Sequence, residues 1–131
     1  MTQQTDSDSR QVFVGQADQI ASACRFVRHA LAASGVTHRI PDGVLMASEL
    51  VTNAVVHGHG AVEVSVGVFA HDVRVGVASA SADAGRPHPV RPAPRDVSGR
   101  GLGIVDQLAA RWGTERTRDG RTSVWFALPA G

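Results

Sequence analysis

Three polar side chains at four-residue intervals are the first residues whose types and spacing could do chemistry. Glu49, Asn53 and His57 recur within residues 41–57, and residues four apart lie on one face of an α-helix. A carboxylate can act as a base toward a hydroxyl or water, an amide oxygen can bind Mg²⁺, and an imidazole can donate to a phosphate. The same spacing also fits an ordinary solvated helix face. Spacing alone leaves both interpretations open.

A second candidate is the glycine-rich segment 98–103. Its glycines, Gly99, Gly101 and Gly103, follow a proline-rich stretch and precede a segment of helical periodicity. Glycines let the backbone approach an anion closely, and free N–H groups at the start of a helix point toward it. The dinucleotide-binding fingerprint is excluded, because no apolar strand immediately precedes the segment and the final glycine is missing. A phosphate-binding loop and a flexible hinge both remain open.

Few elements are needed to position these candidates. Apolar periodicity predicts helices over residues 17–33 and 41–57, and a third helix that starts at the glycine-rich segment and stops at Gly113. Alternation of apolar and polar residues predicts five strands, near 11–14 and over 62–68, 73–77, 114–117 and 122–128. Because the strands are grouped, the order predicts an α+β fold. We expect a two-layer sandwich with a mostly antiparallel mixed sheet and about three helices on one face.

Composition and charge limit the function classes. The chain has 131 residues, and its 13 basic residues are all Arg, so Schiff-base chemistry and a P-loop lysine are excluded. A net charge of +1 is too small to attract nucleic acid electrostatically. Without an apolar run long enough for a membrane or a signal peptide, we expect a cytoplasmic protein with no membrane partner. The polar residues 1–10 predict a disordered tail, and 11–131 a single domain.

Two further groups of side chains have residue types that can do chemistry. Cys24 lies at core spacing in 17–33, so packing is expected rather than a role as nucleophile. His57 and His59 with Glu49 could suggest zinc, but zinc needs three or four converging ligands and the two histidines flank a helix end. Neither group is expected to carry the function.

Three segments together are more specific than any one of them. Residues 48–58 (SELVTNAVVHG) resemble the N box of the GHKL (Bergerat-fold) ATPases, particularly the anti-sigma-factor serine/threonine kinases. Residues 98–106 resemble that family's glycine-rich lid box, and 120–126 its terminal strand signature. The resemblance covers about residues 11–128 and implies a histidine-kinase-like ATPase domain.

The resemblance also implies a site and partners. It implies bound ATP and Mg²⁺, with Asn53 holding the metal and Glu49 as the general base for the attacking hydroxyl. The other cofactor-binding residues that it implies are His57, Gly58, Ser79, Gly85, Gly99, Arg100, Gly101, Leu102, Gly103 and Thr122. The implied partners are a STAS-type anti-sigma-factor antagonist, which accepts the phosphate on Ser or Thr, and a sigma factor. A homodimer is left open.

One position departs from the family pattern. Ser79 stands where these proteins usually carry an aspartate that accepts a hydrogen bond from the adenine amino group. A hydroxyl can accept the same bond, but a charge-assisted bond is about twice as strong. Asp83 could substitute only if its loop folded back, and Gly85 matches a remnant of the family's glycine box. Two functions therefore remain: a protein kinase, or a partner-binding module on the same fold that has lost catalysis.

Overall fold

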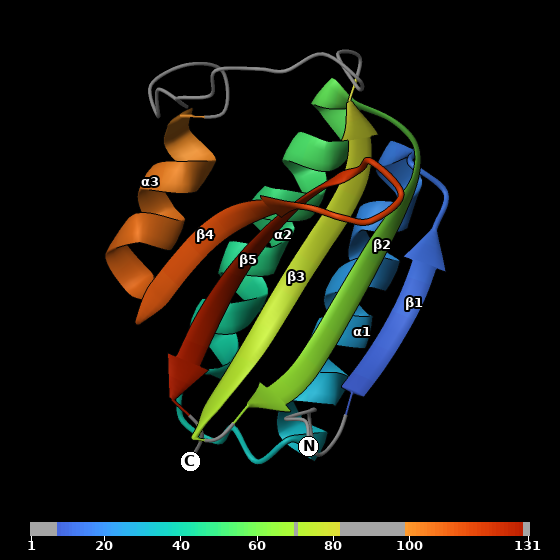
Figure 1. Cartoon of the computed structure of the whole chain (residues 1–131). Coiled ribbons are helices and arrows are strands. Elements are labelled where there is room, and N and C mark those ends of the chain that lie inside the picture. The colour runs from blue at the N-terminus through green and yellow to red at the C-terminus, as the bar shows by residue number, and fades with distance from the viewer. Residues whose placement is uncertain (1–7, 70, 82–98, 130–131) are drawn as a thin grey trace.

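Five strands form one antiparallel sheet, and the helices lie against one of its faces (Figure 1). The structure, a computed structural model, describes residues 8–69, 71–81 and 99–129. The strands are β1 (Asp8–Phe13), β2 (Gly58–Phe69), β3 (Asp72–Ser81), β4 (Arg111–Arg116) and β5 (Thr122–Pro129). Their order is β1-β2-β3-β5-β4. The predicted α+β sandwich is confirmed, although the pairings among the described strands are all antiparallel rather than mixed.

The helical layer follows the predicted order, but the last helix ends earlier than predicted. Its members are the short 3₁₀ helix η1 (Ala17–Gln19), α1 (Ile20–Ala33), α2 (Ile40–His57) and α3 (Gly99–Leu108). The prediction that Gly113 stops α3 is wrong: the helix ends at Leu108, and Gly113 lies inside β4. The Ala110 N–H already donates to the Ala127 carbonyl, so the chain has joined the sheet before Gly113. In the described residues, no helix combines the length and apolarity needed to span a membrane.

The first strand starts earlier than its own sequence indicates. β1 begins at Asp8, so residues 8–10 of the predicted tail belong to the sheet, whereas residues 1–7 lie outside the described part of the chain. Asp8 pairs with Gly67 and Arg10 with Ser65 of β2. The polar start of β1 is therefore held by a backbone ladder with a neighbour rather than by buried side chains.

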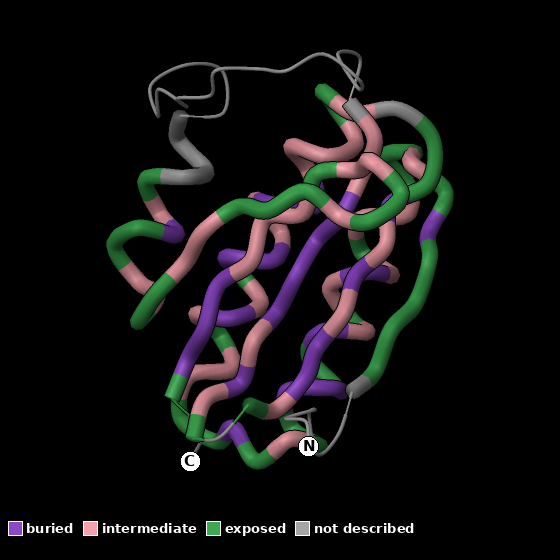
Figure 2. The backbone as a smooth tube through the Cα atoms, viewed as in Figure 1, coloured by how far each residue is buried: buried purple, intermediate pink, exposed green. Residues whose placement is uncertain are grey.

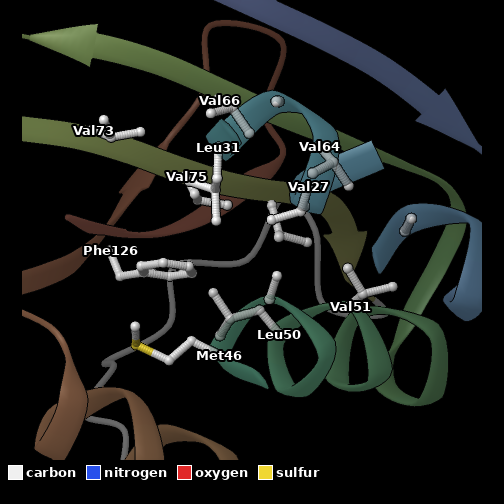
Figure 3. Close-up of a cluster of buried hydrophobic side chains, with 14 of the residues drawn as sticks. Val27, Leu31, Met46, Leu50, Val51, Val64, Val66, Val73, Val75 and Phe126 are labelled. Carbon is white, nitrogen blue, oxygen red and sulfur yellow. The ribbon is translucent and has the colours of Figure 1, made fainter. Parts of the chain in front are cut away.

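The core fills the space between the sheet and the helices. Alternate valines of β2 and β3 point to the helical side, where they meet the buried stripes of α1 and α2 (Figures 2 and 3). Figure 3 labels Val27, Leu31, Met46, Leu50, Val51, Val64, Val66, Val73, Val75 and Phe126 from five elements. Full burial of one such side chain is worth about 1.5–3 kcal/mol. The core thus fixes α2 against the sheet along its length. Cys24, expected to pack, is half-buried on α1.

Candidate functional site

Helix α2 presents Glu49 and Asn53 beside its buried face. Met46, Leu50 and Val51 of this helix are buried in the core, while Glu49 and Asn53 are half-buried next to them. Neither polar side chain makes a hydrogen bond or ion pair with another residue that the structure describes. A solvated helix face would expose both groups fully. Half-buried and without a partner in the part of the chain that the structure describes, they are instead available to a ligand.

The end of α2 meets the end of β3. His57 is the exposed last residue of α2, and Gly58 begins β2. A Cβ added at Gly58 would lie 3.1 Å from the Ser79 hydroxyl oxygen and 2.5 Å from the Ala54 carbonyl oxygen. Gly58 therefore lacks a side chain because backbone and Ser79 occupy that space. This packing requirement exists whether or not Gly58 contacts a cofactor.

Ser79 and Thr122 lie side by side at the same end of the sheet. They are register partners in the β3–β5 ladder, so their side chains share a face. Ser79 continues the alternation of Val75 and Val77, which are buried on the helical side. Ser79 is half-buried and Thr122 is exposed. The structure thus brings His57, Gly58, Ser79 and Thr122 together on the helical side of one sheet end.

The turn before Thr122 is fixed by a local polar network. The Thr117 hydroxyl donates to Asp119 at 2.5 Å, and the Arg121 side chain donates to the same carboxylate at 3.1 Å. These two contacts hold the pKa of Asp119 below its ordinary value. Arg121 also pairs with Glu63 at 3.0 Å, which ties the turn to β2. The start of β5 and its Thr122 are therefore well positioned.

Helix α3 runs antiparallel to α2 and packs against it. A guanidinium N–H of Arg39, which precedes α2, donates to the Leu108 carbonyl at the end of α3 at 2.5 Å. The start of α3 and the ends of α2 and β3 all lie toward the top of Figure 1.

The glycine-rich segment has a different character from Gly58. Gly103 is exposed, and a Cβ added there would meet nothing within 4 Å. No packing contact accounts for a glycine at this position. Residues Gly99, Arg100, Gly101 and Leu102 form the first turn of α3, whose free N–H groups suit an anion; Gly85 lies outside the described residues.

The donor set suits a phosphate-bound cation better than a metal held by protein alone. Among the residues that the structure describes, no group of three or more His, Cys, Asp or Glu side chains is arranged to hold a metal ion. Mg²⁺ is commonly bound through one or two protein oxygens together with phosphate oxygens and water. The Asn53 amide, the Glu49 carboxylate and the N–H groups at the start of α3 match that chemistry.

Comparison with known families agrees with this geometry. The family model described as "Histidine kinase-like ATPase domain" matches residues 13–128. The chain belongs to the histidine-kinase-like ATPase family. The matched range of this ATPase domain contains every candidate site residue, from Glu49 to Thr122, and family membership indicates ATP as its ligand. The GHKL resemblance is thereby confirmed at the level of the family. A search of curated proteins returned no match.

Sequence reasoning missed the residues that attach α3 to this ATPase domain. Arg39 bonds to Leu108, which lies 69 positions away, and the Trp112 indole N–H donates to Asp106 at 2.9 Å. The first pair joins residues too far apart for any local pattern to reveal. The second spans the end of a helix and the start of a strand, where periodicity breaks off.

Proposed function

We propose that this protein is an ATP-dependent serine/threonine protein kinase of the anti-sigma-factor type. It transfers the γ-phosphate of ATP to a Ser or Thr of a STAS-type antagonist and also binds a sigma factor. One observation carries the proposal: Glu49 and Asn53, one helical turn apart, are half-buried and have no partners among the described residues. Helix α3 packs against α2, and the backbone N–H groups at its start suit phosphates.

The chemistry assigned to these residues is phosphoryl transfer. The Glu49 carboxylate accepts the proton of the acceptor hydroxyl, and the oxygen of that hydroxyl bonds to the γ-phosphorus of ATP. The bond between the γ-phosphorus and the β–γ bridging oxygen breaks, which gives ADP and a phosphoprotein. Asn53 holds Mg²⁺ through its amide oxygen. When bound, Mg²⁺ neutralises charge on the phosphates. Positioning and charge neutralisation supply most of the catalysis in such reactions.

Adenine recognition is assigned to the sheet end. The Ser79 hydroxyl is half-buried on the helical side and lies against Gly58, where it can accept a hydrogen bond from the adenine amino group. Thr122 is its register partner on β5. A neutral hydroxyl makes a weaker bond to adenine than a carboxylate does.

That weaker bond favours a second candidate function. A partner-binding regulatory module on the same fold would capture its partner without useful catalysis and would tolerate Ser79 in place of a carboxylate. The two candidates differ in one measurable property. A kinase must bind ATP together with Mg²⁺ at cellular nucleotide concentrations, and a pure binding module has no such need.

Calorimetry with ATP and Mg²⁺ tests the proposal first. We expect the unmodified protein to bind and Asn53→Ala to lose Mg²⁺-dependent binding, while Gln11→Ala, which removes an exposed amide from β1, binds normally. Absence of binding to the unmodified protein at millimolar nucleotide would favour the partner-binding module.

Radiolabelled ATP and a candidate STAS-type antagonist test the transfer step. Glu49→Gln keeps the shape of the side chain but removes the base, so transfer should fall by about 10²- to 10⁴-fold while ATP still binds. The matched control is Glu115→Gln, which removes an exposed carboxylate from β4. Equal transfer by Glu49→Gln and the unmodified protein would refute the role of Glu49.

A further inference from the structure

Arg39 joins the two helices that carry the candidate site. Its side chain is about one-third exposed, and its Nε donates to Asp42 in the first turn of α2 at 3.2 Å. A second N–H, on Nη2, donates to the Leu108 carbonyl at the end of α3. The last carbonyls of a helix have no partner within it, and a cation there is favourable. The bonds to Asp42 and Leu108 form what we call the Arg39 bridge.

Residues 104–108 of α3 attach this helix to the rest of the domain. Val105 is fully buried, and Ile104 and Leu108 pack against the core. Asp106 accepts the indole N–H of Trp112 on β4. Toward the start of the helix, Gly103 is exposed, with free space where a side chain would be. These contacts and the bond from Arg39 to Leu108 hold the second half of α3 in place.

We propose that Arg39 is a positioning residue that sets where the start of α3 lies relative to Glu49 and Asn53. This inference rests on the proposed function, because it takes the start of α3 as the phosphate-binding end. Helix α2 carries both the Arg39 bridge at its beginning and the polar stripe further along. One rigid element thus fixes the distance between the phosphate-directed N–H groups and the two side chains that meet the metal and the acceptor hydroxyl.

Loss of the bridge has a selective consequence. If α3 is free to pivot, the N–H groups at its start are no longer pre-organised, and interactions with the β- and γ-phosphates weaken. In the proposed site, Ser79 on β3 binds adenine and α3 does not, so loss of the Arg39 bridge leaves adenine recognition unchanged. The ratio of ATP affinity to AMP affinity should therefore fall, whereas a general loss of folded protein would lower both affinities equally.

Nucleotide titration of Arg39→Met tests this selectivity. Methionine keeps much of the aliphatic stem and removes the guanidinium. We expect ATP affinity in the presence of Mg²⁺ to fall about fivefold or more, with AMP affinity unchanged. Arg111→Met is the matched control, because Arg111 forms an ion pair with Asp72 on the sheet and its side chain makes no hydrogen bond to α3 among the described residues. An unchanged ratio of ATP to AMP affinity would overturn the inference.

Amide hydrogen exchange without nucleotide provides an independent readout. The amides of α3 should exchange faster in Arg39→Met than in the unmodified protein, and those of β3 at the same rate. Asp106→Ala, which removes an exposed acceptor, should give a similar result if Arg39→Met does not fold. If the unmodified protein binds no nucleotide, the proposed function fails. The amide hydrogen exchange rates of α3 then decide by themselves whether Arg39 holds the helix. Equal rates in Arg39→Met and the unmodified protein would refute the inference.

Discussion

At the residue scale, the proposed adenine contact depends on Ser79. Its hydroxyl stands at the helical side of the sheet end, and the missing side chain of Gly58 leaves it room. A hydrogen bond to a charged group contributes about 1.5–3 kcal/mol, against about 0.5–1.5 kcal/mol for a neutral pair. The residue type at position 79 is thus worth about tenfold in affinity.

Ser79→Asp should therefore tighten nucleotide binding. We expect the dissociation constant for ATP to fall by about five- to tenfold, measured by calorimetry in the presence of Mg²⁺. Ser123→Asp adds the same charge at the next residue after Thr122 on β5, where alternation turns the side chain to the opposite face of the sheet, so it serves as the control. Equal affinities for Ser79→Asp and the unmodified protein would mean that adenine does not lie against this residue.

At the element scale, the junction between α2 and β2 explains why two glycines near the site should respond differently to substitution. Helix α2 ends at His57 and β2 begins at Gly58, with no loop between them. The Ala54 and Ala80 carbonyl oxygens lie close to the position that a Cβ on Gly58 would occupy. Gly103 has open space around it and lies within a helix. One glycine is required by packing, and the other is not.

Paired substitutions at these glycines test that difference. Gly58→Ala would put a Cβ 2.5 Å from one carbonyl oxygen and 3.0 Å from another, so the free energy of unfolding should fall by about 1–3 kcal/mol. Gly103→Ala should raise it by about 0.5–1 kcal/mol, because alanine is the better helix former. Urea denaturation measures both. A stable Gly58→Ala protein would show that the junction can relax.

Elements with strong local patterns were predictable from the sequence. The alternating valines of β2 and β3 and the wide apolar stripe of α2 specify their own structures, since each pattern has only one face to bury. The end of α3 was not predictable, because it is set by the bond from Ala110 to Ala127 of a strand later in the chain. The start of β1 depends in the same way on its partner β2.

The candidate site divides along the same line. Four-residue spacing was enough to place Glu49 and Asn53 on one face of a helix. Their burial, and the approach of Ser79 to Gly58, depend on how helix and sheet pack, which spacing does not encode. The Arg39 bridge joins residues 69 positions apart and could be found only in three dimensions.

At the scale of the whole molecule, a single core supports every part of the site. Helices α1 and α2 and the sheet share the buried cluster of Figure 3, and Val105 of α3 belongs to it. The opposite face of the sheet carries no helix among the described elements (Figure 1). There the Arg74 guanidinium lies over the Trp125 ring at 4.0 Å and the Phe69 ring at 4.9 Å. Unfolding should therefore disrupt the site and the core together.

Because the site exists only in the folded chain, nucleotide should stabilise the whole domain. A ligand that binds only the folded state adds about 2.7 kcal/mol to the free energy of unfolding at 100 times its dissociation constant. Thermal unfolding with ATP and Mg²⁺ should show a midpoint that rises with nucleotide concentration, and Asn53→Ala should abolish the rise while Gln11→Ala preserves it. Binding to the folded state must raise the midpoint by mass action alone. If ATP shifts the unfolding midpoint of neither the unmodified protein nor the two variants at any concentration, the polar stripe of α2 does not bind a nucleotide.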